Sequence, residues 1–384
     1  MKYRKFGNVD FKVSALGFGC MRFPTDPETS AIMEDESIGM IRHAIDEGVN
    51  YIDTAYPYLG GKSEIIVGKA LKDGYREKVK LATKCPVWLV KTAEDFDKYL
   101  DEQLSKLQTD NIDFYLLHAL DKESWENTVL KCNLLERAEA AIKSGKIKHI
   151  GFSFHDNYDA FVEIIDGYDK WDFCQIQYNY LDVNNQAGTK GLKYAAAKGL
   201  AVIIMEPLLG GKLANSPKPI QEIFDINKKK RAPYDWALQW LWNQPEVSVV
   251  LSGMSNMEQV HGNLKAAEAS GVNSLTNEEL EIVERVEKKY REMVKIPCTK
   301  CGYCMPCPNN VNIPRNFDLF NNGFIHDNVE ASRAMYKRLS AMPQGKELAS
   351  SCIGCKVCED KCPQRIEISQ WMVKVHEVLG EGKE

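Results

Sequence analysis

The sequence lacks long apolar runs, a basic excess and, before Cys298, any closely spaced cysteine pair. No window approaches the roughly 20 apolar residues of a membrane helix, and the N-terminal MKYRKFGNVD has no stretch of signal-peptide length. A net charge of -5 offers no broad positive field for nucleic acid, and we expect the one dense basic run, residues 228–231, to be a solvated loop. The sequence therefore predicts a cytoplasmic protein that binds neither membranes nor nucleic acid.

Twelve cysteines are present, but a reducing compartment argues against a disulfide framework. Four of them are scattered, and we expect these four to be small core residues: Cys20, Cys85, Cys132 and Cys174. The other eight fall in two clusters after residue 297, so they require a separate explanation.

Between residues 16 and 265, eight short apolar segments alternate with longer helical patterns. The segments are ALGFG, NYIDT, VKLATK, IDFYLLH, IKHIGFS, FCQIQYN, LAVIIME and VSVVLSG. Most are continuously apolar, as parallel strands buried on both faces are. Amphipathic helices are predicted over 34–47 and 93–107, and Gly48, Gly145 and Gly199 stand where helices commonly end.

Eight strand–helix units in about 250 residues match the size of a (β/α)8 TIM barrel. The rival is a doubly wound open sheet, which usually carries a G-x-G-x-x-G turn after its first strand. Here GFGCMRF follows that strand and the third glycine is missing. The α/β barrel is therefore favoured. A capped, charged helix is predicted over 276–294, and the composition changes near residue 295.

Polar residues stand at the carboxyl ends of three predicted strands, where barrel active sites lie. Asp53, Lys84 and His118 each end a strand, and Tyr58 follows Asp53 in the connecting loop. Each residue alone has an ordinary structural role as a cap, a surface lysine or a hydrogen-bonded core histidine. Their placement on one rim instead indicates a shared site.

Together these four side chains suit the reduction of a carbonyl group. A tyrosine with a pKa near 10 donates a proton poorly at neutral pH, and a neighbouring ammonium group lowers that pKa. Asp53 would pair with Lys84 and compensate its burial, while a neutral His118 would orient the substrate oxygen. The expected chemistry is hydride addition at carbon with Tyr58 as the proton donor.

The motifs DTAYPY, ATK, LLH, GFS, QIQYNY and LSGMSNMEQVHGNL follow one another along the predicted barrel. In this order they resemble the aldo-keto reductase family. The resemblance implies a (β/α)8 barrel, NAD(P)H without flavin, and a small carbonyl or alcohol substrate. It also implies four catalytic residues: Asp53, Tyr58, Lys84 and His118.

The same resemblance implies a set of cofactor-binding residues. They are Gly19, Cys20, Asp53, Ser153, Gln175, Met205, Leu208, Gly210, Lys212, Gly253, Gln259 and Asn263. Ser153 and Gln175 would hold the nicotinamide carboxamide, and Met205 takes the place of a stacking aromatic ring. Gly253 and Gln259 stand where basic residues commonly grip a 2′-phosphate, so NAD and NADP both stay open.

The two cysteine runs have the spacing of iron–sulfur ligands. The second run is C-x2-C-x2-C-x3-C-P, the bacterial ferredoxin pattern, and the first is one residue shorter before its last cysteine. Structural zinc is the alternative, but zinc has little use for a third cysteine at that spacing. Two [4Fe-4S] clusters are predicted, one on Cys298, Cys301, Cys304 and Cys362, the other on Cys352, Cys355, Cys358 and Cys307.

The segment between the runs contains HDNVEASRAMYKRLSAM, which predicts a helix. We therefore expect a barrel over residues 1–295 and a small, mainly helical ferredoxin-like domain over 296–384. The predicted function is an iron–sulfur oxidoreductase resembling aldo-keto reductases.

Clusters carry single electrons whereas a nicotinamide carries hydride, and no flavin site is evident between the two. The clusters would therefore supply electrons to the barrel, link it to an external ferredoxin or flavoprotein, or be structural or oxygen-sensing. The alternatives are an electron-transfer subunit whose barrel is a docking scaffold, and a redox sensor.

Overall fold

The computed structural model describes residues 1–26, 28–298, 302–362 and 364–383. The chain forms two compact units. The first consists of Met1–Ala214 and Arg231–Leu280, and the second of Asn215–Lys230 and Glu281–Glu384. The boundary between the units thus lies near residue 280, and residues 215–230 belong with the C-terminal part. The boundary expected from the sequence was residue 295.

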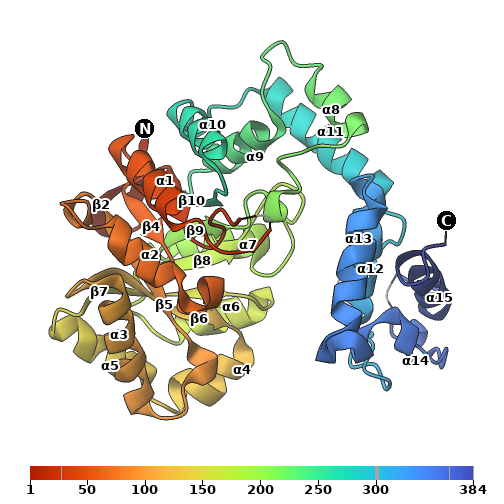
Figure 1. Ribbon diagram of the computed structural model, residues 1–384, viewed down its shortest axis with the longest axis horizontal. Helices are drawn as coiled ribbons and strands as arrows, with labels where there is room; N and C mark the ends of the chain where they lie inside the picture. The colour runs from red at the N-terminus through yellow and green to blue at the C-terminus, as the bar shows by residue number, and fades with distance from the viewer. Residues whose placement is uncertain (27, 299–301, 363, 384) are drawn as a thin grey trace. The chain divides into compact units, whose positions relative to one another are not determined.

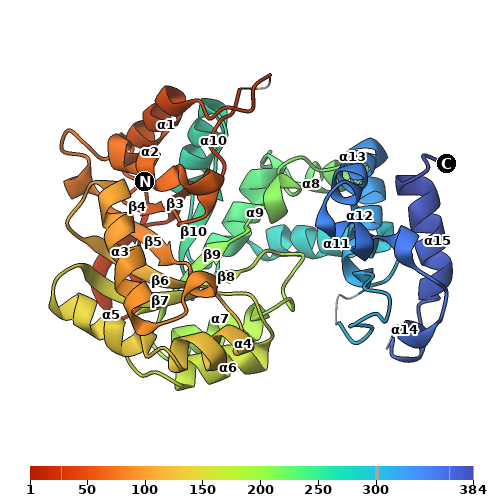
Figure 2. The same ribbon diagram turned by 60° about the horizontal axis from the view of Figure 1, so that its bottom comes forward.

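Eight parallel strands of the first unit close into a barrel in the order β10-β3-β4-β5-β6-β7-β8-β9 (Figure 2). Every predicted strand segment corresponds to one of them, so the barrel prediction is confirmed. The strands are β3 (Leu16–Gly19), β4 (Tyr51–Asp53), β5 (Lys80–Cys85), β6 (Ile112–Leu120), β7 (Ile147–Phe154), β8 (Phe173–Gln177), β9 (Ala201–Met205) and β10 (Val247–Gly253).

Helices surround the barrel on its outside (Figures 1 and 2). They are α1 (Glu34–Asp46), α2 (Ser63–Ala70), α3 (Ala93–Leu107), α4 (Lys122–Ser124), α5 (Leu134–Lys143), α6 (Tyr158–Asp166), α7 (Gly188–Ala197), α9 (Pro233–Trp242) and α10 (Met257–Glu268). The predictions over 34–47 and 93–107 are confirmed by α1 and α3. Gly48, Gly145 and Gly199 have φ of 95°, 79° and 83°, the left-handed conformation that ends a helix.

A hairpin that the sequence analysis missed lies at the N-terminus. Strands β1 (Tyr3–Phe6) and β2 (Val9–Ser14) pair antiparallel around Gly7 and Asn8, a two-residue hairpin signal. Phe6 is fully buried, with its ring centroid 4.6 Å from that of Phe114. Because Phe114 belongs to the apolar filling of the barrel interior, the hairpin closes the end opposite the strands' carboxyl ends.

The barrel interior is filled by side chains that recur every second residue along the strands, as pleating requires. One buried layer includes Tyr51, Ala82, Leu116, Phe173, Ile203 and Leu251. Two residues further along each strand, towards its carboxyl end, are Asp53, Lys84, His118, Gln175, Met205 and Gly253. The alternation that builds the core therefore also turns these residues, most of them polar or small, toward the interior of the rim.

The second unit is helical and has its own core. Its helices are α8 (Lys218–Phe224), α12 (Ile313–Ile325), α13 (Val329–Ser340), α14 (Val357–Asp360) and α15 (Ile368–Leu379), with most of α11 (Asn277–Met293). Helices α12, α13 and α15 pack together around Phe317, Phe320, Leu339 and Met372 (Figure 1). The predicted helices over 276–294 and 326–342 are confirmed by α11 and α13.

Two expectations about individual residues need correction. Arg231 is not solvated, because its side chain is 6% exposed, pairs with Glu279 and lies 4.9 Å from the ring of Trp236. Of the scattered cysteines, Cys132 is only partly buried, while the other three are core residues as predicted. Within the described ranges, no helix combines the length and apolar character needed to cross a bilayer.

Candidate functional site

Three of the four predicted catalytic side chains meet in a hydrogen-bonded group at the rim. Lys84 Nζ donates to Asp53 Oδ1 at 2.6 Å and to the Thr54 carbonyl at 2.8 Å. It also lies 3.4 Å from the Tyr58 hydroxyl oxygen. Lys84 is 1% exposed and Asp53 2%. A buried ammonium needs such partners, and the pair arises because β4 and β5 are neighbours in the barrel.

Burial and the ion pair together set the ionisation of this group. Burial is the largest single effect on Lys84 and disfavours its ammonium, but the charges and hydrogen bonds of Asp53 and Tyr58 together outweigh burial and leave the Lys84 pKa raised. Burial raises the pKa of Tyr58, and Lys84 only partly opposes that rise. From the sequence, we expected Lys84 to lower the tyrosine pKa overall. Its effect has the expected sign but is smaller than that of burial.

His118 lies beside this group and is neutral. Its ring packs edge-on to Tyr58, with centroids 6.1 Å apart and an interplanar angle of 80°. Burial, assisted by the charge of Lys84, lowers the His118 pKa to about 2. The Nδ1 atom is buried without a hydrogen-bond partner. A neutral imidazole with an unused polar atom fits a small polar ligand bound at this position.

The two residues expected to hold a carboxamide lie on adjacent strands. Ser153 on β7 pairs in register with Gln175 on β8, and both are almost fully buried. Ser153 Oγ accepts from the Ala119 amide at 2.7 Å, and its own hydrogen stays available for donation. Gln175 Nε2 donates to Asp53 Oδ2 at 3.3 Å, which connects the expected cofactor residues to the Lys84 group.

Small residues leave room along the neighbouring part of the rim. Gly19 and Gly253 are paired in register on β3 and β10. A Cβ at Gly253 would approach the Arg22 side chain to 3.3 Å, and one at Gly210 would lie 3.6 Å from Arg22 Nη2. Gly210 and Gly253 thus lie against Arg22, and we call Gly19, Gly210, Gly253 and Arg22 the cradle; its small residues and its cation suit an anionic ligand.

The remaining expected cofactor residues are distributed around the same rim. Asn263 Nδ2 donates to Ser252 Oγ at 2.9 Å, and Gln259 Oε1 accepts from the Ser255 amide at 2.8 Å. The Cys20 amide donates to the Asp53 carbonyl at 2.8 Å. Met205 ends β9, and Leu208 and Lys212 flank the short turn at Leu209–Gly211. Their contact with a cofactor stays a prediction.

Two further side chains at this rim, Trp88 and Arg22, were not predicted from the sequence. Trp88 is 52% exposed, and its ring centroid lies 5.1 Å from that of His118. Arg22 belongs to the GFGCMRF turn and lies 3.9 Å from Glu206. The sequence contained two signals for them: a large aromatic residue lies four positions after Lys84, and a basic residue lies three positions after Gly19.

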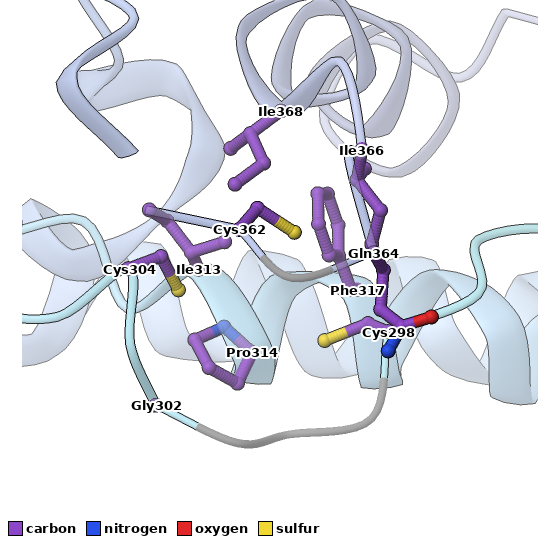
Figure 3. A pocket seen from close by; sticks show the side chains of 10 residues that line it. All are labelled: Cys298, Gly302, Cys304, Ile313, Pro314, Phe317, Cys362, Gln364, Ile366 and Ile368. Atoms are coloured by element: carbon purple, nitrogen blue, oxygen red, sulfur yellow. The ribbon is translucent and has the colours of Figure 1, made fainter. Parts of the chain in front are cut away.

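The predicted metal ligands line two pockets of the second unit. One contains Cys298, Cys304 and Cys362 among apolar walls that include Ile313 and Ile368. Figure 3 shows the three sulfur atoms directed into the same space from separate segments of chain. The fourth predicted ligand, Cys301, lies outside the described residues.

The other pocket contains all four remaining cysteines, Cys307, Cys352, Cys355 and Cys358. Ile313 and Ile368 line it as well, so the two pockets are adjacent. In each pocket, thiols of one run face a thiol of the other, the crossed arrangement expected from the sequence. Among the described side chains, no three metal-ligating groups meet closely enough for a single ion.

The first unit is thus a (β/α)8 barrel with ionisable side chains grouped at its carboxyl rim, the arrangement of a barrel enzyme. Comparison with family models extends this result. Residues 15–288 match the aldo/keto reductase family, and residues 297–367 match a 4Fe-4S dicluster domain. The chain therefore belongs to the aldo/keto reductase family and carries a 4Fe-4S dicluster domain at its C-terminus, as the motifs predicted.

Relatives support this assignment. L-galactose dehydrogenase of Arabidopsis thaliana is 30% identical over 306 residues, covering 74% of this chain and 94% of that protein. The uncharacterized oxidoreductase YrpG of Bacillus subtilis (strain 168) is 27% identical over 70% of this chain and 92% of its own. These relatives identify the chain as an oxidoreductase.

Solved structures agree in fold. Aldo-keto reductase AKR11C1 of Bacillus halodurans in its holo form has a TM-score of 0.62 and 28% identity, covering 74% of this chain and 96% of its own. An aldo/keto reductase of Klebsiella pneumoniae in complex with NADP and acetate also scores 0.62, with 25% identity, covering 74% and 95%. Family and fold support nicotinamide and iron–sulfur cofactors.

Proposed function

We propose that the barrel reduces a small carbonyl compound with NAD(P)H, or oxidises the corresponding alcohol, and that Tyr58 transfers the proton. The observation that carries this proposal is the contact of Lys84 Nζ with both Asp53 and Tyr58, at 2.6 and 3.4 Å. Lys84 and Tyr58 come from different segments of the barrel, and the neutral His118 adjoins them.

A nicotinamide held by this rim would supply the hydride. Tyr58 donates its phenolic proton to the substrate oxygen as negative charge develops there. Lys84, held by Asp53, stabilises the phenolate that remains. Because His118 is neutral, its imidazole orients the carbonyl oxygen by a hydrogen bond and adds no competing charge. Trp88 offers an apolar face at the open side of the site.

The cradle beside this group is proposed to hold the dinucleotide. Ser153 and Gln175 would bind the carboxamide, and Gly19, Gly210 and Gly253 allow the backbone to approach the ligand. Arg22 supplies a cation at the wall of this cradle. Gly253 and Gln259 offer no positive charge to a 2′-phosphate, whereas Arg22 does, so both NAD and NADP stay candidates.

The two cysteine pockets are proposed to hold two [4Fe-4S] clusters. Four described thiols in one pocket, and three in the other, fit the one thiolate per iron that such a cluster uses. Cys307 lines the pocket of the second run, which supports its role as the fourth ligand there. Such clusters exchange single electrons, so an external ferredoxin or flavoprotein is the proposed electron partner.

The catalytic proposal is tested by Tyr58→Phe in protein purified without air. Turnover of simple aldehydes with NADH or NADPH should fall about 10²- to 10⁴-fold, the usual contribution of a general acid. Tyr56→Phe is a matched control, because the Tyr56 hydroxyl lies 3.2 Å from Glu102 rather than at the Lys84 group. Equal activity in Tyr58→Phe with unchanged iron content would refute the proton donor.

The cluster proposal is tested by iron and sulfide analysis of the anaerobic protein. About eight irons per chain are expected from two cubane clusters. Cys355→Ser should lower the iron content and alter the visible spectrum, while Cys132→Ser should change neither. A colourless protein with one zinc per cysteine group would contradict the assignment.

A further inference from the structure

A buried carboxylate that the proposed chemistry does not use lies directly behind the site. Glu64, in the first turn of α2, is fully buried. Its Oε1 atom accepts from Thr83 Oγ1 at 2.7 Å and from Gln103 Nε2 at 2.6 Å. The other oxygen has no hydrogen-bond partner, and Lys106 Nζ lies 3.9 Å away. Burial raises the Glu64 pKa, which shows how unfavourable its setting is for a charge.

Gln103 connects this carboxylate to the residue that carries the reaction. Its Nε2 atom donates to the Lys84 carbonyl at 3.0 Å, and its Oε1 atom accepts from Tyr115 at 2.7 Å. Gln103 is itself fully buried, on α3. Gln103 on α3 and Glu64 on α2 therefore hold the carboxyl end of β5 from outside the barrel.

The residue before Glu64 holds the two preceding strands in the same way. Ser63 Oγ lies 2.6 Å from the Cys20 carbonyl, to which it donates, and 2.8 Å from Thr54 Oγ1. Thr54 in turn provides the carbonyl that accepts from Lys84 Nζ. Adjacent residues of one helical turn thus contact the ends of β3, β4 and β5, the strands that bring Cys20, Asp53 and Lys84 to the rim.

The position of Tyr58 depends on the same helical turn. Tyr58 begins a 3₁₀ turn, Tyr58–Gly61, in which Leu59 and Gly60 have positive φ of 54° and 65°. The backbone hydrogen bonds of the turn are local, from the Tyr58 amide to Ala55 and from the Lys62 amide to Leu59. This short turn therefore joins Tyr58 to the start of α2 at Ser63.

We propose that Ser63, Glu64 and Gln103 form a positioning cluster that holds the phenol of Tyr58 against the ammonium of Lys84. The inference rests on the proposed carbonyl reduction, since it assigns these residues to that reaction's geometry. The Tyr58–Lys84 distance of 3.4 Å lies at the limit of a hydrogen bond. A small shift of β5 or of the turn would break the contact, and misplacement by about 1 Å is enough to cost 10²-fold in rate.

The cluster is tested by Gln103→Leu, which removes the donor to the Lys84 carbonyl and keeps the side chain apolar and of similar size. The matched control is Gln239→Leu in α9. Gln239 is also buried, and its amide donates to the Ala266 carbonyl at 2.8 Å and to Asp235 at 2.9 Å. Both changes delete a buried glutamine that joins a carboxylate to a backbone carbonyl, but only Gln103 adjoins the site.

We expect Gln103→Leu to lower kcat about 10- to 100-fold and to change KM by no more than about twofold. It should also shift the alkaline limb of the pH profile, which reports the ionisation of Tyr58 and Lys84. Gln239→Leu should lower Tm by a similar amount but leave kcat and the alkaline limb unchanged. A Gln103→Leu enzyme with the parent kcat and pH profile would overturn the proposal, as would equal kcat losses in the two variants. If Gln103→Leu does not fold, Thr83→Val, which removes one donor to Glu64, takes its place with the same criteria.

Amide hydrogen exchange provides a readout that does not need turnover. Gln103→Leu should exchange at least about tenfold faster than the parent in peptides covering 54–64 and 81–85, and Gln239→Leu should not. If the parent protein showed no turnover, the proposed function would be refuted. If hydrogen exchange in Gln103→Leu were unchanged, only the positioning cluster would be refuted.

Discussion

At the residue scale, burial dominates the ionisation of Tyr58 and His118, whereas buried neighbours keep Lys84 charged. Tyr58 and His118 both shift toward their neutral forms, one with a raised pKa and the other with a pKa lowered to about 2. Lys84 keeps its charge because Asp53 is buried with it. In the proposed reaction, this set supplies one proton donor, one neutral orienting group and one fixed cation.

These shifts predict the pH dependence of carbonyl reduction. A donor with a raised pKa stays protonated below its usual value of about 10, so activity is lost only as the pH rises through that raised value. His118, with its lowered pKa, does not titrate in the assay range. The profile of kcat/KM should therefore be flat from about pH 6 to about pH 9. An acidic limb near pH 6.5 that disappears in His118→Gln would contradict this assignment.

Arg22 is expected to contribute to dinucleotide binding. A charge-assisted hydrogen bond contributes about 1.5–3 kcal/mol, so Arg22→Ala should weaken binding about 10- to 100-fold in a fluorescence titration. The comparison of NADH with NADPH shows whether Arg22 contacts the 2′-phosphate, since in that case only NADPH binding is weakened. Lys2→Ala, in the exposed N-terminal segment, is the control. Unchanged affinity for both nucleotides would exclude Arg22 from the cradle.

At the scale of elements, the N-terminal hairpin stabilises the barrel from its closed end. Phe6 packs among Tyr51, Phe114 and Phe173, with ring centroids 4.6 to 6.0 Å away. These rings lie in the interior layer beneath the site. The hairpin is therefore part of the barrel core, although its sequence is short and precedes the first barrel strand.

Deleting the Phe6 ring should destabilise the barrel. Phe→Ala in a filled core costs about 3–5 kcal/mol, so Phe6→Ala should lower the urea midpoint of the transition followed by barrel tryptophan fluorescence. Tyr3→Ala on the same strand is the matched control, because Tyr3 is 50% exposed. A midpoint for Phe6→Ala equal to that of Tyr3→Ala would show that the hairpin adds nothing to the core.

At the scale of the whole molecule, the two units obtain their stability differently. The barrel buries a continuous apolar core between its sheet and helices. The core of the second unit is smaller, and it includes or contacts Cys298, Cys304, Cys307, Cys352, Cys358 and Cys362. The thiols proposed to bind clusters are part of that packing, so we expect metal binding and folding to be coupled there.

Iron removal should consequently affect the second unit alone. Chelator treatment in air is expected to make residues 302–383 sensitive to protease while the barrel segments 1–214 stay resistant. Limited proteolysis with mass spectrometry of the fragments measures this difference. If the treated and untreated proteins gave the same fragments, the clusters would not be required for folding of the second unit.

The sequence by itself determined the eight strands, the barrel and the cysteine runs, because these depend on local apolar runs, spacing and turn residues. Asp53, Lys84 and His118 were also proposed as site residues in this way, since each lies at the carboxyl end of a predicted strand. Only the tertiary structure revealed Phe6 beneath the barrel, Arg22 beside Gly253, and Glu64 with Gln103 behind Lys84. Each of these contacts joins segments distant in the chain, and burial, which sets the pKa of Tyr58, is a property of the assembled fold rather than of any local pattern.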